Sequence, residues 1–207
     1  MKHEWRKHEK EIYLPKQIPT LVKIPKFKFI TIKGQGNPNS KDFEHRIQAL
    51  YPIAYTIKMM PKKGIVLDGY YEYTVYPLEG IWDLTERGRK LDILDKNELV
   101  YTIMIRQPDF VTEDVFRKAV EMVMSKNNSK LFEEVQFEEI EEGLCVQMMH
   151  IGSYDDEPKS FAFMNQYIED NSLELVTKVH REIYLSDARR VETSKQKTIL
   201  RYRVNKI

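Results

Sequence analysis

Two segments of the sequence share one pattern, in which an apolar strand leads through a glycine turn into a capped helix. When FITIKGQGNPNSKDF is placed beside VQMMHIGSYDDEPKSF at a constant offset, Gly34 aligns with Gly152 and Phe43 with Phe161. Further along, TVYPLEG resembles EIYLSDA, and another strand pattern follows each of them. The chain is therefore either two strand–helix–strand–strand units or a single unit with a chance match, since short patterns recur in unrelated sequences.

The apolar periodicity predicts three helices. Asn39 or Ser40 can cap a helix over DFEHRIQALYPIAYTIKMM, which Pro52 is expected to kink or interrupt. A threonine cap and an apolar stripe predict a second helix over residues 112–126. A proline near the start of a helical pattern predicts a third over about residues 158–169.

Aromatic and β-branched runs predict the strands. The first starts at residue 26, in KFKFITIKGQG, and two more follow in YYEYTVYPLEGIWDL and ELVYTIMIRQPDF. The run VQFEEIEEGLCVQMMHI is typical of a strand, a turn and a second strand, and TKVHREIYLSD and KTILRYRV close the chain. Helices mixed with antiparallel strands predict an α+β fold.

The organisation of the chain follows from these elements. Residues 1–25 are rich in Lys, His and Glu and contain three prolines, so we expect a leader segment on the surface. Residues 26–207 then form a single domain. Its first half (about 26–110) and second half (about 135–207) are joined by the helix over residues 112–126.

Charge and cysteine content exclude several classes of function. The 33 basic and 32 acidic side chains interleave, so we expect no basic field for nucleic acid. No apolar run approaches the roughly 20 residues that span a bilayer, and no signal peptide is apparent, which predicts a cytoplasmic protein without membrane contact. The single cysteine, Cys145, excludes an internal disulfide and a thiolate metal site, and we expect neither a metal nor a cofactor. Edge strands bordered by Lys and Arg favour a monomer.

Strand alternation places three polar side chains on one face of the second half. If the helix packs against the apolar positions of TKVHREIYLS, then His180, Glu182 and Tyr184 occupy the opposite face. Two sheets related by a pseudo-twofold axis would enclose a groove that these side chains share with Trp82 and Met104. A groove of aromatic, thioether and carboxylate groups suits a flat, apolar and often cationic molecule.

A family resemblance rests on four motifs: PLEGIWDL, TIMIRQPDFVTEDVFRKAV, EEGLCVQMMHIGSYDDEP and HREIYLSDARR. Together they resemble stand-alone members of the GyrI-like small-molecule-binding domain family over nearly the full length of the chain. The resemblance implies two pseudo-symmetric β-α-β-β units that form antiparallel sheets around a central groove. Related effector-binding domains are fused to DNA-binding helices in MerR-type and AraC-type multidrug regulators, and no such helix pair precedes residue 26.

The same resemblance implies roles for individual residues. Glu182 matches the acidic residue of the groove floor, Trp82 the aromatic wall, and Tyr184 and His150 neighbouring positions. Some stand-alone members are implicated in hydrolysing strained cyclopropane rings, for which Glu182 could activate water while Tyr184 donates to a carbonyl. The chain carries Asp83 where similar members often have a second aromatic residue, so the ligand preference of the family does not transfer directly.

Residue types alone leave simpler interpretations open for each of these positions. Glu182 could pair with a cation on a strand surface, and Trp82 could be a core residue. His150 could bond the backbone of a turn. Tyr55, on the first helix, could turn its hydroxyl into the groove or pack with that hydroxyl satisfied.

The leading functional hypothesis is binding of amphipathic aromatic or cationic small molecules, such as drugs or toxins, in the groove. Hydrolysis of strained cyclopropane-containing electrophiles could accompany binding. The alternative is a protein-binding module that resembles the gyrase-inhibiting members of the family, which would need an exposed face rather than a groove.

Overall fold

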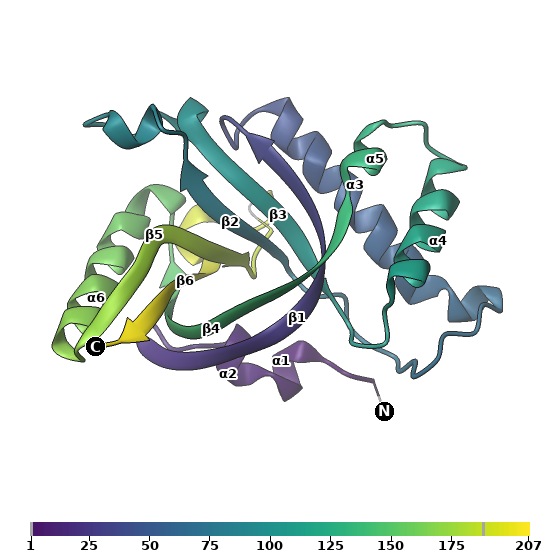
Figure 1. The fold of residues 1–207 in the computed structure, drawn as a ribbon, viewed down its shortest axis with the longest axis horizontal. Helices are drawn as coiled ribbons and strands as arrows, with labels where there is room; N and C mark the ends of the chain where they lie inside the picture. Colours follow the sequence, from purple (N-terminus) through teal and green to yellow (C-terminus); the bar gives the residue numbers. More distant parts are fainter. Residues whose placement is uncertain (1, 188) are drawn as a thin grey trace. The chain divides into compact units, whose positions relative to one another are not determined.

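The order of elements repeats along the chain in the computed structural model, which describes residues 2–187 and 189–207. The first set is β1 (Thr20–Gln35), α3 (Lys41–Met59), β2 (Leu78–Leu84) and β3 (Leu99–Gln107). The second set is β4 (Gln136–Ile151), α6 (Glu157–Asp170), β5 (Leu173–Tyr184) and β6 (Lys197–Lys206). Between them lie α4 (Glu113–Met124) and α5 (Leu131–Glu134), and before them lie α1 (Trp5–His8) and α2 (Lys10–Tyr13). The order β–α–β–β therefore occurs twice, and the predicted α+β fold class is confirmed (Figure 1).

The chain divides into two units. The first comprises Phe27–Tyr76 and Asp83–Ile140, with the N-terminal residues up to Glu4. The second comprises Trp5–Lys26, Pro77–Trp82 and Glu141–Ile207. Most of β2 therefore belongs with the second set of elements, although it lies in the first set by sequence.

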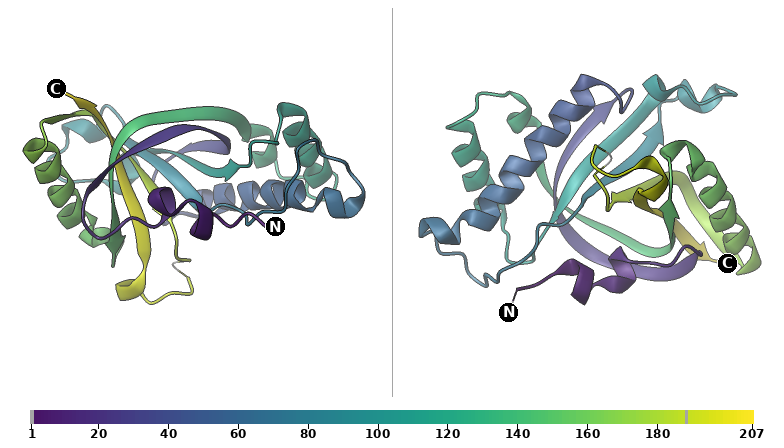
Figure 2. Two further views of the ribbon diagram at one scale, coloured as in Figure 1. Left: turned by 90° about the horizontal axis from the view of Figure 1, so that it is seen from below. Right: turned by 180° about the vertical axis from the view of Figure 1, so that it is seen from behind.

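In the first unit, β1 and β3 pair antiparallel from Lys28 opposite Gln107 to Gln35 opposite Val100. α3 begins where the Ser40 hydroxyl accepts a hydrogen bond from the backbone N–H of Phe43, which satisfies an otherwise free donor of the first turn. The helix packs against β3 and α4 (Figure 2). It continues through Pro52 as one element, where the sequence predicts a kink or an interruption.

The second unit contains an antiparallel sheet in the order β2, β5, β6, β4. α6 lies along β5 and β6 (Figure 1). Its apolar side chains Met164 and Ile168 share a core with Leu200 and Tyr202 of β6 and with Val146 of β4. Burial of these side chains fixes the helix on one face of the sheet.

The structure differs from the sequence prediction in three further places. Regular structure starts well before residue 26, because α1, α2 and the beginning of β1 precede it, and Trp5 and Tyr13 are buried. β4 is a single strand of 16 residues in which Gly143 adopts a φ of 71°, so the predicted turn is a local irregularity that glycine accommodates. Residues 70–76 contain an isolated bridge from Tyr73 to His3 rather than a strand.

No helix in the described part of the chain is long and apolar enough to cross a membrane.

Candidate functional site

A cluster of polar and aromatic side chains lies where β2 pairs with β5 in the second unit. The register places Trp82 opposite His180 and Gly80 opposite Glu182. His180, Glu182 and Tyr184 alternate along β5, so they share one face, as the sequence predicts. We call Trp82, His180, Glu182 and Tyr184 the β5 cluster.

The hydrogen bonds of the β5 cluster converge on one carboxylate. The hydroxyl of Tyr184 donates to Oε2 of Glu182 at 2.8 Å, and Nε2 of His180 lies 3.0 Å from Oε1. Nε1 of Trp82 in turn donates to the hydroxyl oxygen of Tyr184 at 2.8 Å. Burial, followed by the charge of Glu182, raises the pKa of Tyr184 well above its ordinary value, so this phenol stays a neutral donor at physiological pH.

Gly80 makes this arrangement sterically possible. A Cβ atom at residue 80 would lie 2.8 Å from Nε1 of Trp82 and 3.2 Å from the hydroxyl oxygen of Tyr184. Only a residue without a side chain lets the indole and the phenol meet above β2.

α6 covers the same face of β5 that carries the cluster. The ring of Phe161 lies 4.8 Å from that of His180 and 5.0 Å from that of Tyr202. The sequence-based expectation that the helix packs on the opposite face, against Ile183, is therefore wrong. Alternation shows which residues share a face, but both faces of β5 are buried at residues 181–183, so it does not show which of them the helix covers.

Glu157, the first residue of α6, brings a second carboxyl group to the cluster. Its side chain contacts that of Glu182, and the residue is only 7% exposed. Burial, and then the charge of Glu182, raises the pKa of Glu157 to about 9. Glu157 therefore favours its protonated form at neutral pH.

The cluster approaches solvent at Tyr154, in the short 3₁₀ turn before α6. Tyr154 is 39% exposed, and its ring meets that of Tyr184 edge-on with the centroids 6.1 Å apart. Burial, followed by the charges of Glu182 and Glu157, raises the pKa of Tyr154 to about 12.

His150 makes contacts of a different kind. Nδ1 lies 2.9 Å from the hydroxyl of Ser160, and Nε2 lies 2.9 Å from the carbonyl oxygen of Ser153. These bonds tie the end of β4 to the turn and to α6, and they engage both ring nitrogens. A pocket of about 320 Å³ lies beside His150 and is also lined by Ser160 and Phe163.

Two of the predicted site residues lie in the first unit. Met104 is fully buried on β3, in register with Thr31. Tyr55 is half-exposed on α3, where its ring lies 6.4 Å from that of Tyr51. The other four, Trp82, His150, Glu182 and Tyr184, lie in the second unit, and three of them belong to the β5 cluster.

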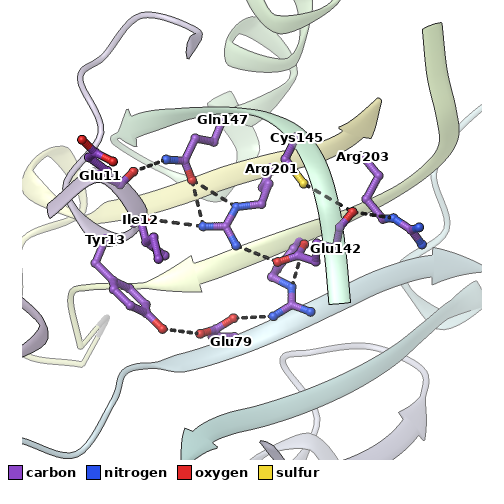
Figure 3. Close-up of polar contacts among 10 residues, drawn as sticks. Glu11, Ile12, Tyr13, Glu79, Glu142, Cys145, Gln147, Arg201 and Arg203 are labelled. Atoms are coloured by element: carbon purple, nitrogen blue, oxygen red, sulfur yellow. Dashed lines mark hydrogen bonds and ion pairs between the residues drawn. The ribbon is translucent and has the colours of Figure 1, made fainter. Parts of the chain in front are cut away.

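The opposite face of the same sheet carries a buried ion network (Figure 3). Arg181 bonds Glu79 at 2.7 Å and Glu142 at 3.1 Å, and Arg201 bonds Glu142 at 2.7 Å. Burial opposes the charge of Glu142, but Arg181 and Arg201 outweigh it and hold its pKa below the ordinary value. Gln147 completes the network with 2.8 and 3.0 Å bonds from Arg201.

The network also holds the N-terminal segment. Arg201 donates to the carbonyl oxygen of Ile12, Gln147 donates to that of Glu11, and the Tyr13 hydroxyl donates to Glu79. Each charged side chain of the network lies beside an opposite charge, as a structural role requires.

Sequence reasoning missed Glu157 and Gly80. A glutamate in the first turn of a helix is ordinarily a solvated partner of the helix dipole, so nothing in DDEPKSF indicates that Glu157 is buried against another carboxyl. Gly80 was detectable in principle, because an isolated glycine in a strand pattern marks a close approach by a neighbouring group. In the described part of the chain, no three His, Cys, Asp or Glu side chains group as a metal site requires.

Comparison with solved structures shows close similarity over nearly the whole chain. A hydrolase from Listeria innocua is 37% identical with a TM-score of 0.89, over 98% of this chain and 100% of that one. An uncharacterized conserved protein from Listeria innocua is 39% identical with a TM-score of 0.91, over the same shares of the two chains. The C-terminal domain of EcmrR is 16% identical with a TM-score of 0.51, over 91% of this chain and 98% of that one, and is similar in fold alone.

No curated protein sequence matches the chain. The family model described as "GyrI-like small molecule binding domain" matches residues 18–203, which include β1 to β5, the whole β5 cluster and most of β6. The chain therefore belongs to the GyrI-like small-molecule-binding domain family.

Proposed function

We propose that the β5 cluster binds amphipathic aromatic cations. The observation that carries this proposal is a carboxylate, Glu182, set among the rings of Trp82, His180 and Tyr184 with only 8% of its residue surface exposed. A desolvated carboxylate attracts a cation more strongly than a solvated one does, and neighbouring rings stabilise a flat organic cation through cation–π contacts. A neutral ligand would gain only the apolar part of this interaction.

A second candidate function is hydrolysis of strained cyclopropane-containing electrophiles at the same cluster. The observation that favours it is a protonated carboxyl, Glu157, beside the carboxylate of Glu182. Glu182 could take a proton from water as the water oxygen bonds a ring carbon. The broken C–C bond leaves its electrons on a conjugated carbonyl as an enolate, and once Glu182 is protonated the Tyr184 hydroxyl can donate to that enolate oxygen. The enolate carbon then takes the proton of Glu157, and the proton held by Glu182 restores Glu157. The net change is addition of water across one ring bond, and the similarity to a protein named as a hydrolase supports testing it.

Binding is tested by the fluorescence anisotropy of ethidium, a planar aromatic cation, titrated with wild type and with Glu182→Gln. We expect the variant to bind at least about tenfold more weakly, because it loses a charge-assisted contact that is about 1.4 kcal/mol or more in a desolvated site. Glu174→Gln is the matched control, since Glu174 lies on the same strand and is exposed. Equal affinity in wild type and Glu182→Gln would contradict the proposal.

The hydrolytic function is tested in the same proteins with a cyclopropane-containing electrophile and mass spectrometry of the product. We expect a product heavier by one water with wild type and with Glu174→Gln, and none above the uncatalysed background with Glu182→Gln. Background rates with wild type would rule out this second function and leave the binding function standing.

A further inference from the structure

Glu157 has an unusual position for an acidic residue at the start of a helix. It is more than nine-tenths buried, and among the described residues no hydrogen-bond donor reaches its Oε1 atom. Its carboxyl contacts that of Glu182. Two carboxylates repel each other and have no hydrogen to share, so this contact is favourable only while one of them is protonated.

The groups that face Glu157 come from two elements. Glu182 and Tyr184 face it from β5, and Asp155 and Tyr154 from the turn before α6. The two phenols remain neutral up to high pH, because burial and the neighbouring carboxylates raise their pKa values. His180 is one further step away, bonded to the far oxygen of Glu182.

Among the described residues, the side chains that most affect the pKa of Glu157 are the acidic groups of Glu182 and Asp155. A proton between Glu157 and Glu182 therefore takes the place that a lysine or arginine side chain occupies in a salt bridge. An organic cation that enters the cluster would supply the missing positive charge and would stabilise both carboxylates in their ionised forms.

We infer that Glu157 holds a proton that a bound cation displaces, so that the site binds aromatic cations with release of a proton and discriminates against neutral ligands. This inference rests on the proposed binding function and specifies its ligand class. The reaction is balanced by the solvent: the carboxylic acid of Glu157 becomes a carboxylate, the cation takes its place as the partner of both groups, and the buffer accepts the proton.

The inference has a quantitative signature in the pH dependence of binding. Free Glu157 is protonated below its pKa of about 9, and a cation in contact lowers that value. Affinity for a permanent cation should then rise with pH, by up to about tenfold per unit, between the bound and the free pKa, and level off above about 9. A neutral ligand of the same shape should show no such rise.

The experiment is isothermal titration of the full chain with ethidium, whose charge is permanent, in two buffers of different ionisation enthalpy at about pH 8. We expect wild type to release close to one proton per ligand bound. Glu157→Gln keeps the size and the neutral state of the side chain, so it should bind ethidium with no net proton release and with an affinity independent of pH from about 6 to 9. The neutral parent ring system, 6-phenylphenanthridine, tests the discrimination against neutral ligands in wild type.

The possible results separate the inference from the function on which it rests. Proton release in wild type that Glu157→Gln abolishes supports the inference. Binding without proton release, or release that persists in Glu157→Gln and so comes from another group, overturns it and leaves the binding function intact. Failure of every aromatic cation to bind wild type overturns both.

Discussion

Gly80 shows how one residue without a side chain can determine the geometry of a site. It lies opposite Glu182 in the β2–β5 register, and the space above it is filled by the Trp82 indole and the Tyr184 hydroxyl. These two groups orient each other and, through Tyr184, the carboxylate of Glu182. The absence of a side chain at residue 80 therefore allows the donors of Trp82 and Tyr184 to take up these positions.

We expect Gly80→Ala to weaken ethidium binding several-fold and to lower the free energy of unfolding by about 1–3 kcal/mol, the usual range for an added methyl group in a packed site. The new Cβ would displace the indole from the tyrosine hydroxyl. Anisotropy titrations and urea denaturation measure the two effects.

Gly34→Ala is the control for this substitution. Its Cβ would collide with the ring of Tyr101 in the first unit, so this variant should lose stability without losing affinity for ethidium. Unchanged affinity in Gly80→Ala would show that the Trp82–Tyr184 contact does not contribute to the site.

At the scale of elements, α6 brings a buried acid to the β5 cluster at the expense of stability at high pH. The pKa of Glu157 is about 9 in the folded chain, against an ordinary value of 4.5. Between these two values the unfolded chain has released the proton and the folded chain has kept it. Stability should therefore fall as pH rises through this window and level off above about 9.

Urea denaturation of wild type and Glu157→Gln over this range of pH tests the effect. We expect the stability of wild type relative to the variant to be greatest below about pH 4.5 and to decline steadily as pH rises. Parallel stability curves would show that Glu157 is not protonated in the folded chain.

Local signals predicted the helices well. The Ser40 cap, the threonine cap of α4 and the proline near the start of α6 all act over a few residues, and the structure places helices at Lys41–Met59, Glu113–Met124 and Glu157–Asp170. The alternation of His180, Glu182 and Tyr184 was also predictable, since it depends only on strand geometry.

Features that depend on distant partners could not be predicted. Glu157 meets Glu182 only because α6 covers one face of β5 rather than the other, and residues 5–13 are ordered by partners more than 60 residues away. Arg181 is buried on the other face of the sheet. The sequence pattern could not predict this burial, because such patterns assign charged positions to solvent. The ion pairs that make this burial possible are contributed by β2 and β4.

At the scale of the whole molecule, the buried ion network explains how a polar N-terminal segment becomes part of the fold. Arg201 and Gln147 donate hydrogen bonds to the carbonyl oxygens of Ile12 and Glu11. Trp5 and Tyr13 of the same segment are buried. Segment and network depend on each other, because the arginines need acceptors and the backbone carbonyls need donors.

Glu142 is the residue on which this dependence can be measured, since it accepts from both Arg181 and Arg201. We expect Glu142→Gln to lower the free energy of unfolding by about 3–5 kcal/mol, because it leaves two arginines buried without their shared counter-charge. Glu141→Gln, one residue away and exposed, should change stability by no more than about 0.5 kcal/mol. Urea denaturation measures both.

If the network anchors the N-terminal segment, limited proteolysis of Glu142→Gln should cut within residues 5–26 under conditions in which the Glu141→Gln chain stays intact. Equal resistance in the two variants would mean that the packing of Trp5 and Tyr13 holds the segment without the ion pairs.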